Sequence, residues 1–371
     1  MVAGAPTRGA GQPGHVDLVV EVEAALAAFL AQRHVDTAAL DPAFAEATGA
    51  LSDFVLGSGK RIRPTFAWWG WRGAGGDPHG AEAAAVLWAV SALELIQACA
   101  LIHDDLIDAS TTRRGRPALH VQFAHRHCDG AWHGRPDRFG AAAAILLGDL
   151  ALAWADDMLR AAGLPPAAAT RAGAVWEAMR TEMLGGQYLD VLHQSMGDAS
   201  VRAALQVSRF KTAAYTVERP LHLGAALADA TPELIACYRR FGADIGVAFQ
   251  LRDDLLGMFG DPAVTGKPAG DDLREGKRTL LLAVAVQRAD QGGHLGALAA
   301  LDAAVGDPDL GDDDVDRVRT LLCELGAVTA VEQRIGALTG SALDALSSAE
   351  VAEPAAAALA DLAVAATRRR R

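Results

Sequence analysis

Apolar residues recur at every third and fourth position from about Val16 onward, in long stretches rich in Ala, Leu and Glu. This period matches the α-helix, and these residue types have high helix propensity. Several stretches lack a polar face over two or more turns, and a helix that is apolar all round must be buried by other helices. The sequence therefore predicts an all-α fold, a multi-helix bundle with a buried central layer.

The helices are expected over residues 16–32, 41–56, 81–108, 139–162, 167–194, 201–227, 232–259, 279–290, 293–305, 313–325 and 327–347. Residues 125–138 are interpreted as an irregular, exposed insertion, and the Ala-rich tail that ends in arginines as low complexity. Chain length alone would suggest two or three domains of about 150 residues, but no convincing linker is found. We expect a flexible arm over residues 1–15 and one all-α domain over residues 16–371.

Composition excludes several classes of protein. The 371 residues include 46 acidic and 34 basic side chains, a net charge of −12, which disfavours a nucleic-acid binder. The 4 cysteines are widely spaced and form no CxxC pair, so neither a disulfide framework nor a zinc ribbon is indicated. The N-terminus lacks a secretory pattern, and no uncharged apolar run of about 20 residues is found. We expect a cytoplasmic protein without a transmembrane segment.

Two groups of aspartates end apolar helices. Asp104, Asp105 and Asp108 lie in LIHDDLID, where Asp104 and Asp108 share a helix face about one turn apart. Asp253 and Asp254 lie in FQLRDDLLGMFGD, and Asp261 follows. Clustered carboxylates require cations, and oxygen ligands without His or Cys suit several Mg²⁺ ions that bridge to a diphosphate.

Basic residues lie in or beside the loops that flank these helices, although the chain as a whole is acidic. They are Lys60, Arg61, Arg63, Arg113, Arg114, Lys211, Lys267 and Lys277. Arg forms bidentate contacts with phosphate, and Lys supplies a mobile point charge. The pattern predicts that two diphosphates bind, one through metal ions and the other directly through Lys and Arg.

Five segments together resemble the motifs of trans-isoprenyl diphosphate synthases. They are GSGKRIRP, LIHDDLIDASTTRRG, GGQYLD, FKTAAY and FQLRDDLLGMFGDPAVTGKPAGDDLREGKR, and the resemblance covers roughly residues 40–290. It implies an all-α bundle around a deep central cavity, in a homodimer. It also implies head-to-tail condensation of isopentenyl diphosphate with an allylic diphosphate and release of pyrophosphate. The released pyrophosphate would be the base that takes up the proton, because the motifs demand no isolated His or Glu.

The resemblance assigns roles residue by residue. The metal ligands would be Asp104, Asp108 and Asp253, supported by Asp105 and Asp254. The allylic diphosphate would bind Arg113, Lys211 and Lys267, and isopentenyl diphosphate would bind Lys60, Arg63, Gln97 and Arg114. Thr212, Gln187 and Gln250 would lie near the reacting carbons, and Lys277 and Asp190 complete the set.

Two positions bear on how the reaction differs from that of relatives. The second aspartate motif of the family usually reads DDxxD, but Gly257 stands at its last position here. One turn before the first motif lie two small residues, Cys99 and Ala100, where farnesyl-producing relatives typically carry a bulky aromatic. The resemblance therefore implies a product longer than farnesyl, geranylgeranyl diphosphate, with Ile96 and Leu93 as candidate floor residues.

Four alternatives remain. A class I terpene cyclase would use the same aspartates but needs no second diphosphate site. A farnesyl or longer-chain polyprenyl synthase would differ only in product length. A non-catalytic partner subunit would not need both clusters. An HD-type phosphohydrolase built on His103 and Asp104 would need further His ligands, yet His125, His127 and His133 fall in one segment.

Overall fold

The computed structural model describes residues 15–57, 59–260 and 269–368, and over this part of the chain the fold is all-α, as predicted. The helices are α1 (His15–Leu40), α2 (Pro42–Leu56), α3 (Ile62–Gly73), α4 (Ala83–Ser91), α5 (Leu93–Ile107), α6 (Leu119–Asp129), α7 (Pro136–Arg160), α8 (Pro166–Met196), α9 (Val201–Val207), the π-helix η1 (Ser208–Glu218), α10 (Arg219–Leu227), α11 (Pro232–Phe259), α13 (Asp271–Arg274), α14 (Leu280–Gln291), α15 (Leu295–Ala304), α16 (Asp312–Glu324), α17 (Ala327–Ser347) and α18 (Ala355–Thr367). The described strands, β1 (Thr112–Arg113) and β2 (Arg116–Pro117), form one short antiparallel hairpin.

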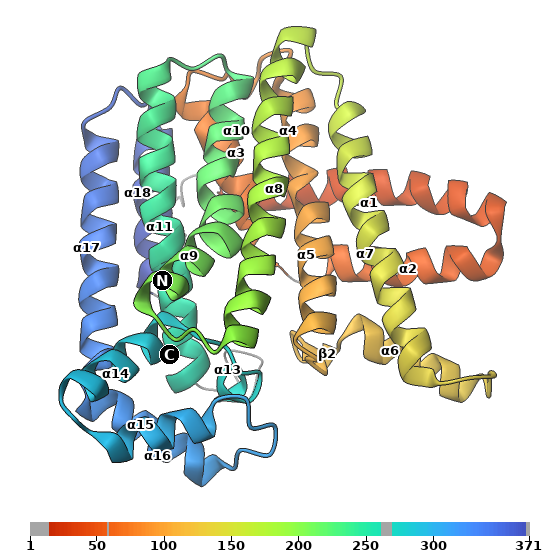
Figure 1. Ribbon diagram of the computed structural model, residues 1–371. Coiled ribbons are helices and arrows are strands. Elements are labelled where there is room, and N and C mark those ends of the chain that lie inside the picture. Colours follow the sequence, from red (N-terminus) through yellow and green to blue (C-terminus); the bar gives the residue numbers. More distant parts are fainter. Residues whose placement is uncertain (1–14, 58, 261–268, 369–371) are drawn as a thin grey trace, which may run out of the picture.

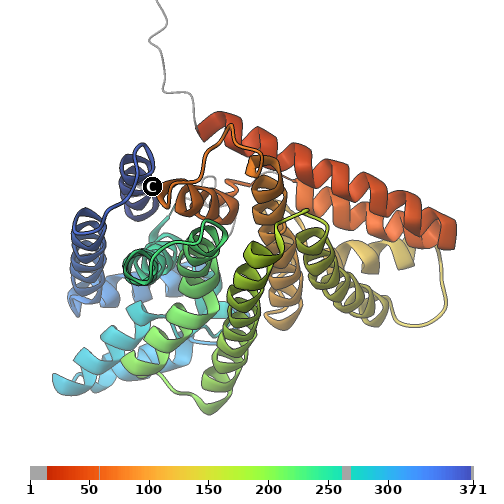
Figure 2. The same ribbon diagram turned by 90° about the horizontal axis from the view of Figure 1, so that it is seen from above.

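The long helices α5, α8 and α11 pass through the middle of the molecule, with η1 and α10 packed between α8 and α11 (Figure 1). On one side α17 and α18 pack along α11, and on the other α6 and α7 pack beside α5. Helices α1 and α2 form an antiparallel pair that crosses over this second side (Figure 2). The lower end in Figure 1 is closed by α14, α15 and α16.

Local sequence explains where several helices begin. Asp41 caps α2, because its side chain accepts a hydrogen bond from the amide of Ala43 at 2.7 Å. Thr231 and Thr279 cap α11 and α14 in the same way. Pro232 then occupies the first turn of α11, where its missing N–H has no partner to lose. These signals are local, which is why the expected range of 232–259 agrees with α11.

The apolar core consists of two clusters. The larger joins α1 to α8, α10 and α18, and the smaller joins α9, α13, α14, α15 and α16. Three elements contribute buried side chains to both clusters: η1, α11 and α17. On α11, Phe241 and Ile245 belong to the larger cluster, whereas Leu251 and Leu255 belong to the smaller one. The two clusters are therefore tied together by continuous helices.

A π-helix interrupts the expected helix over residues 201–227. In η1 the hydrogen bonds join residues five apart, a rare arrangement that is frequent at functional sites. Neighbouring helices approach η1 closely at glycines: a Cβ on Gly186 of α8 would overlap the backbone of Lys211, and one on Gly246 of α11 would overlap Ala213. The absence of side chains at these glycines fixes the position of η1 between α8 and α11.

Three sequence interpretations need correction. Helix α3 covers Ile62–Gly73, which the expected helix ranges leave out, and Pro64 is tolerated there because it lies in the first turn. Residues 125–138 are an irregular, exposed segment only over 130–135: α6 extends to Asp129, α7 begins at Pro136, and His127 is buried. The Ala-rich tail forms α18, in which Ala355, Leu359 and Ala363 recur at helical spacing and are buried.

Two helical stretches are long and apolar enough, by length and composition alone, to cross a membrane: Ala83–Ile107 and Pro136–Arg160. The first is 67% buried in its most apolar window, which is typical of a core helix. The second is 39% buried, because α7 carries exposed apolar side chains.

Candidate active site

A cavity of about 970 Å³ lies between α5, α8, η1 and α11. The segment before α3, the turn of the β1–β2 hairpin and α13 also contribute to its lining. Among the residues predicted from sequence, the cavity lining includes Lys60, Arg63, Gln97, Cys99, Ala100, Asp104, Arg113, Arg114, Gln187, Asp190, Lys211, Thr212, Gln250, Asp253, Asp254 and Lys277. The fold thus brings together residues from widely separated segments.

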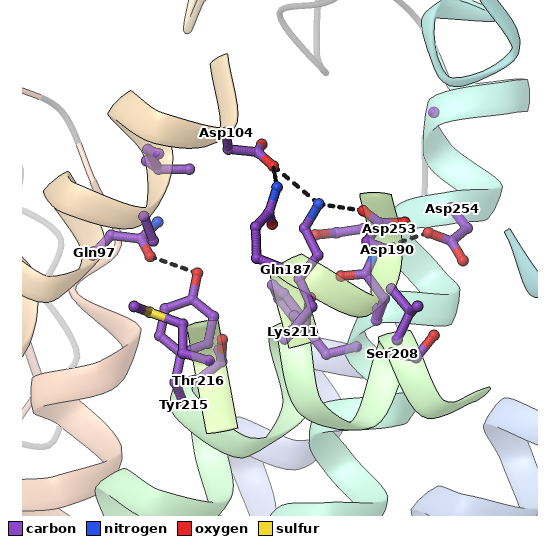
Figure 3. Close-up of a pocket in the computed structure, with 18 of the residues that line it drawn as sticks. Gln97, Asp104, Gln187, Asp190, Ser208, Lys211, Tyr215, Thr216, Asp253 and Asp254 are labelled. Atoms are coloured by element: carbon purple, nitrogen blue, oxygen red, sulfur yellow. Dashed lines mark hydrogen bonds and ion pairs between the residues drawn. The ribbon is translucent and has the colours of Figure 1, made fainter. Parts of the chain in front are cut away.

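Asp104 projects from the end of α5 into this cavity (Figure 3). Its carboxylate lies 3.0 Å from Lys211 Nζ and 3.3 Å from Arg113 Nη2, and it accepts a hydrogen bond from Gln187. Burial opposes ionisation of Asp104, but Lys211, Lys277 and Arg113 outweigh it and hold the pKa of this carboxyl well below its usual range. Asp104 is therefore a fixed negative charge.

Asp105 has a different role from Asp104. It is fully buried and accepts a hydrogen bond from Arg113 Nε at 2.7 Å. Burial would lower the pKa of Arg113, but the hydrogen bond and charge of Asp105 raise it. The structure thus places Asp105 behind the cavity wall, where it holds Arg113 against the first cluster.

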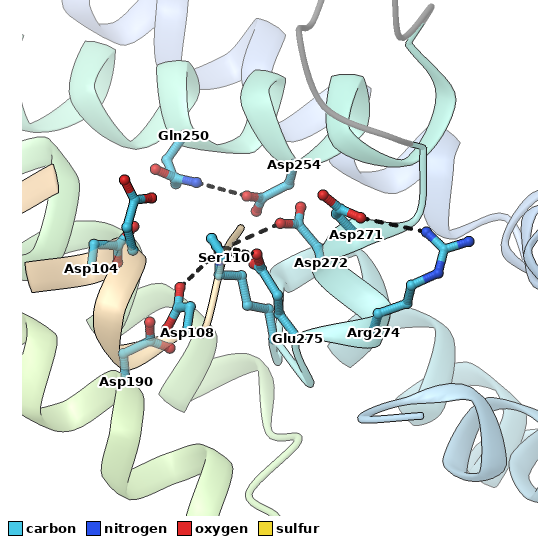
Figure 4. A network of polar contacts seen from close by, with 12 residues as sticks. Asp104, Asp108, Ser110, Asp190, Gln250, Asp254, Asp271, Asp272, Arg274 and Glu275 are labelled. Atoms are coloured by element: carbon cyan, nitrogen blue, oxygen red, sulfur yellow. Dashed lines mark hydrogen bonds and ion pairs between the residues drawn. The ribbon is translucent and has the colours of Figure 1, made fainter. Parts of the chain in front are cut away.

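Asp108 lies one turn beyond Asp104 and reaches a second lysine. Lys277 Nζ lies 3.1 Å from Asp108 Oδ2 and 2.6 Å from Glu275, and Ser110 donates a hydrogen bond to Glu275 (Figure 4). Burial and the charge of Asp104 raise the pKa of Asp108, which Lys277 opposes. Lys277 is thereby held at the edge of the first cluster by residues from both α5 and the segment after α13.

The second cluster lies on α11. Asp253 and Asp254 line the cavity, and Gln250 donates a hydrogen bond to Asp254 at 2.7 Å. Burial raises the pKa of Asp254 to about 8, with further contributions from Asp272 and Asp253. Figure 3 shows Asp253 and Asp254 on the side of the cavity away from α5, which carries Asp104. The two clusters therefore face one common space.

Lys211 of η1 stands between the clusters. Its ammonium lies 2.6 Å from Asp190 on α8 as well as 3.0 Å from Asp104 on α5. Burial alone would lower the pKa of Lys211, but these two aspartates raise it, so the lysine carries its charge in the cavity. An ammonium fixed in this way is suited to neutralising a bound anion.

Part of the cavity wall is basic. Lys60, Arg63 and Arg114 line it, and burial together with the neighbouring Arg61 and Arg113 lowers the pKa of Arg114. Arg61 does not serve the cavity in the same way. Its side chain is 2% exposed, and its guanidinium donates to the carbonyl of Val55 and to Glu94 at 2.8 Å. Arg61 thus fixes the shape of the loop that presents its neighbours.

Sequence reasoning missed Tyr215 and Thr216. The Tyr215 hydroxyl donates a hydrogen bond to Gln97 at 2.9 Å, and the Arg63 guanidinium lies 4.1 Å from the centroid of the Tyr215 ring. Arg63 also donates to Thr216 Oγ1 at 2.8 Å. Tyr215 stands in the FKTAAY segment, but its contacts arise only because η1 packs against α3 and brings the Tyr215 hydroxyl to Gln97 of α5. Tyr215 thus positions Gln97 and Arg63, two of the residues expected to bind isopentenyl diphosphate.

The residues expected to set product length do not all lie at the cavity. Ala100 is half-buried and lines the cavity. Cys99 also lines it, but its Sγ lies 3.7 Å from His103 Nδ1, toward α7, and burial raises the pKa of the thiol to about 12. Ile96 and Leu93 are fully buried in the core and are not among the lining residues. The structure therefore does not place the expected floor residues at the cavity.

Lys267 and Asp261 lie outside the residues that the structure describes. Within the described residues, no three His, Cys, Asp or Glu side chains converge on one point as a ready-made metal site. The clusters instead offer carboxylates from two sides. This fits Mg²⁺, which uses one or two protein carboxylates and completes its shell with water and substrate phosphate oxygens.

An all-α bundle whose cavity holds facing carboxylate clusters and a basic wall defines an enzyme that acts on anionic, diphosphate-like substrates. The family model described as polyprenyl synthetase matches residues 45–307. The chain belongs to this family, whose members use isoprenyl diphosphates, and it is a trans-prenyltransferase.

Three relatives show how far the similarity extends. A geranylgeranyl pyrophosphate synthase from Corynebacterium glutamicum, crystallised with isoprenyl diphosphate and magnesium, is 46% identical, with a TM-score of 0.93, over 96% of this chain and 100% of that one. The geranylfarnesyl diphosphate synthase of Aeropyrum pernix is 34% identical over 81% of this chain and 86% of that protein. The geranylgeranyl diphosphate synthase of Mycobacterium tuberculosis is 33% identical over 79% and 77%.

Proposed function

We propose that this prenyltransferase condenses isopentenyl diphosphate with an allylic diphosphate, using several Mg²⁺ ions, to make geranylgeranyl diphosphate. The observation that carries the proposal is the single cavity in which Asp104 and Asp253 stand on facing walls, with Lys211 between them. The magnesium and isoprenyl diphosphate in the Corynebacterium glutamicum relative support the same chemistry. A cytoplasmic location stays a prediction from the sequence.

The allylic diphosphate would bind at the aspartate clusters. Arg113 and Lys211 supply cationic donors there, and Lys267 is proposed to join them. Divalent cations held by Asp104, Asp108 and Asp253 would neutralise the leaving diphosphate when bound. The fixed charges of Arg113 and Lys211 also stabilise that developing charge without reorganising, which favours ionisation of the allylic C–O bond.

Isopentenyl diphosphate would bind at the basic wall. Lys60, Arg63 and Arg114 line this wall, and Arg63 is pre-oriented by Thr216 and by the ring of Tyr215. Pre-orientation lowers the entropic cost of holding the diphosphate. The C–C bond would form between the two diphosphate sites, beside Thr212, Gln187 and Gln250, where apolar walls exclude bulk water from the cationic carbon.

Product length would be set by Ala100, because this small, half-buried residue borders the cavity one turn before Asp104. The first experiment incubates the full chain and Mg²⁺ with isopentenyl diphosphate and either dimethylallyl, geranyl or farnesyl diphosphate, then sizes the dephosphorylated alcohols. Geranylgeraniol is expected. Farnesol alone, or longer alcohols, would contradict the assigned length, and a hydrocarbon formed without isopentenyl diphosphate would indicate a cyclase.

A pair of variants tests the wall residue. In Ala100→Phe the ring would fill the cavity, so farnesol should replace geranylgeraniol while the protein stays folded. Cys99→Phe directs the same ring toward α7, where His103 already lies against Gly148, so it should lower the melting temperature instead. An unchanged product from folded Ala100→Phe would show that the prenyl chain follows another route.

We also propose a homodimer through α7 and α8. Exposed apolar side chains line α7 at Ile145 and Leu146, and on α8 Leu184, Tyr188 and Val191 repeat at one helical face. Light scattering after size-exclusion chromatography should give twice the chain mass. The double variant Leu146→Glu with Tyr188→Glu should give the monomer mass.

A further inference from the structure

Gly257 leaves the second aspartate cluster without a carboxylate at its last position. Gly257 lies four residues after Asp253 on α11, so both residues share the face that lines the cavity. A glycine at this place supplies no side chain that could contact a cation. A third carboxylate beside Asp253 must therefore come from another part of the chain.

The carboxylate of Asp272 occupies the space in front of Gly257. A Cβ built on Gly257 would lie 2.6 Å from Asp272 Oδ2 and 3.5 Å from Asp272 Cγ. The side chain that the motif usually places at position 257 and the side chain of Asp272 would thus overlap. The main chain holds this arrangement, because the amide of Gly270, next to α13, donates a hydrogen bond to the carbonyl of Gly257 at 3.2 Å.

Asp272 also lines the cavity and shares a cationic neighbour, Lys277, with the first aspartate cluster. It lines the cavity together with Asp253, Asp254 and Gly257, and Figure 4 shows its carboxylate beside that of Asp254. Lys277 Nζ lies 3.6 Å from Asp272 Oδ1 and 3.1 Å from Asp108 Oδ2. One cationic group thus already lies between Asp272 on the α11 side and Asp108 on the α5 side.

We propose that Asp272 supplies the third carboxylate of the second cluster, in place of the residue absent at Gly257, and so helps to hold a divalent cation beside Asp253. The inference rests on the proposed function, because it concerns the cation that Asp253 would hold there. The third carboxylate would then come from α13, in front of the position that Gly257 leaves without a side chain.

Metal binding tests the proposal independently of turnover. Free Mn²⁺ is measured by electron paramagnetic resonance during titration of the full chain in the presence of inorganic pyrophosphate. Asp272→Asn should weaken the affinity for one bound Mn²⁺ by about tenfold or more, the loss typical when a supporting carboxylate of a metal site is removed. The Mg²⁺ concentration needed for half-maximal activity should rise in parallel.

Asp271→Asn is the matched control. It removes the same charge from the adjacent residue of α13, whose carboxylate turns toward Arg274 at 3.5 Å (Figure 4). Equal losses in both variants would reveal a general field effect and overturn the role of Asp272. Unchanged Mn²⁺ affinity in folded Asp272→Asn would overturn it as well.

The double variant Gly257→Asp with Asp272→Gly moves the carboxylate back to α11. It should recover most of the Mn²⁺ affinity lost in Asp272→Asn, because the carboxylate returns to nearly the same space. No recovery in the folded double variant would contradict the proposed equivalence. If instead the unmodified chain bound no Mn²⁺ with pyrophosphate and formed no prenyl product, the proposed function itself would fail.

Discussion

Arg61 shows how a charged residue in a functional loop can serve structure instead of substrate. It adopts a positive φ of 47°, and its buried guanidinium is paired with Glu94. Its hydrogen bonds to Val55 and Gly57 join the end of α2 to the start of α3. Lys60 and Arg63, on either side of it in sequence, are presented to the cavity as a result.

Removing Glu94 should therefore destabilise the fold. Glu94→Ala leaves the Arg61 charge buried with only neutral acceptors and a half-exposed Glu23, so we expect a loss of about 3 kcal/mol in the free energy of unfolding. Urea denaturation followed by circular dichroism measures it. Asp157→Ala breaks an exposed pair with Arg160 and should cost about 0–1 kcal/mol. Equal costs would contradict the importance of burial.

Tyr215 should influence one substrate more than the other. Tyr215→Phe keeps the ring under Arg63 but removes the hydrogen bond to Gln97, so the KM for isopentenyl diphosphate should rise about 2- to 10-fold, as expected for one net hydrogen bond. The KM for the allylic diphosphate should change less. Thr320→Val, which removes an exposed hydroxyl on α16, is the control. A fall in kcat alone would mean that Tyr215 acts on the reaction and not on binding.

At the scale of elements, η1 places Lys211 because glycines allow its neighbours to approach. Gly185 and Gly186 of α8 form a natural comparison: a Cβ on Gly186 would overlap the backbone at Phe210 and Lys211, whereas nothing lies within 4 Å of one on Gly185. One glycine faces η1, and its neighbour in sequence faces open space.

Gly186→Ala should displace η1, at a cost of about 1–3 kcal/mol for overpacking, and should lower kcat/KM because Lys211 moves. Gly185→Ala should be neutral or stabilise α8 by up to about 1 kcal/mol, the gain in helix propensity from Gly to Ala. Thermal unfolding and steady-state kinetics measure the two effects. Similar behaviour of both variants would show that the close approach is unimportant.

Much of the fold and of the site follows from local signals. The period of apolar residues predicts α11 and α17, and the spacing of Asp104 and Asp108 predicts a shared helix face. The π-helix leaves no such signal, because the residues of η1 also fit an α-helix. Packing against α8 and α11 selects the π-helical hydrogen bonds. The role of Asp272 in front of Gly257 was also hidden, since the two residues are 15 positions apart in sequence and only the docking of α13 brings them together.

At the scale of the whole molecule, the cavity lies between the two apolar core clusters. Asp104 stands on α5, which belongs to the larger cluster, whereas Leu251 and Leu255 anchor the carboxyl-terminal half of α11, with Asp253, in the smaller one. A substrate bound at both aspartate clusters would contact both cores. Because η1, α11 and α17 are shared, we expect the cores to unfold together.

Calorimetry should show one unfolding transition. Mg²⁺ with pyrophosphate should raise the melting temperature of that transition without splitting it in two. A ligand present at about 100 times its Kd adds about 2.7 kcal/mol to the free energy of unfolding. Mg²⁺ alone and pyrophosphate alone are the controls and should give smaller shifts. A second transition that ignores the ligand would show that the two cores are independent.

The shared helices also bear on how long the enzyme survives in a cell. Proteases cleave a folded chain mainly when it opens, and a bound substrate that joins both cores makes opening rarer. Segments far from the cavity, such as the α1–α2 pair, would gain the same protection because they belong to the same cooperative unit. A working molecule would therefore be degraded more slowly than an idle one, so that substrate supply would regulate the amount of enzyme as well as its rate.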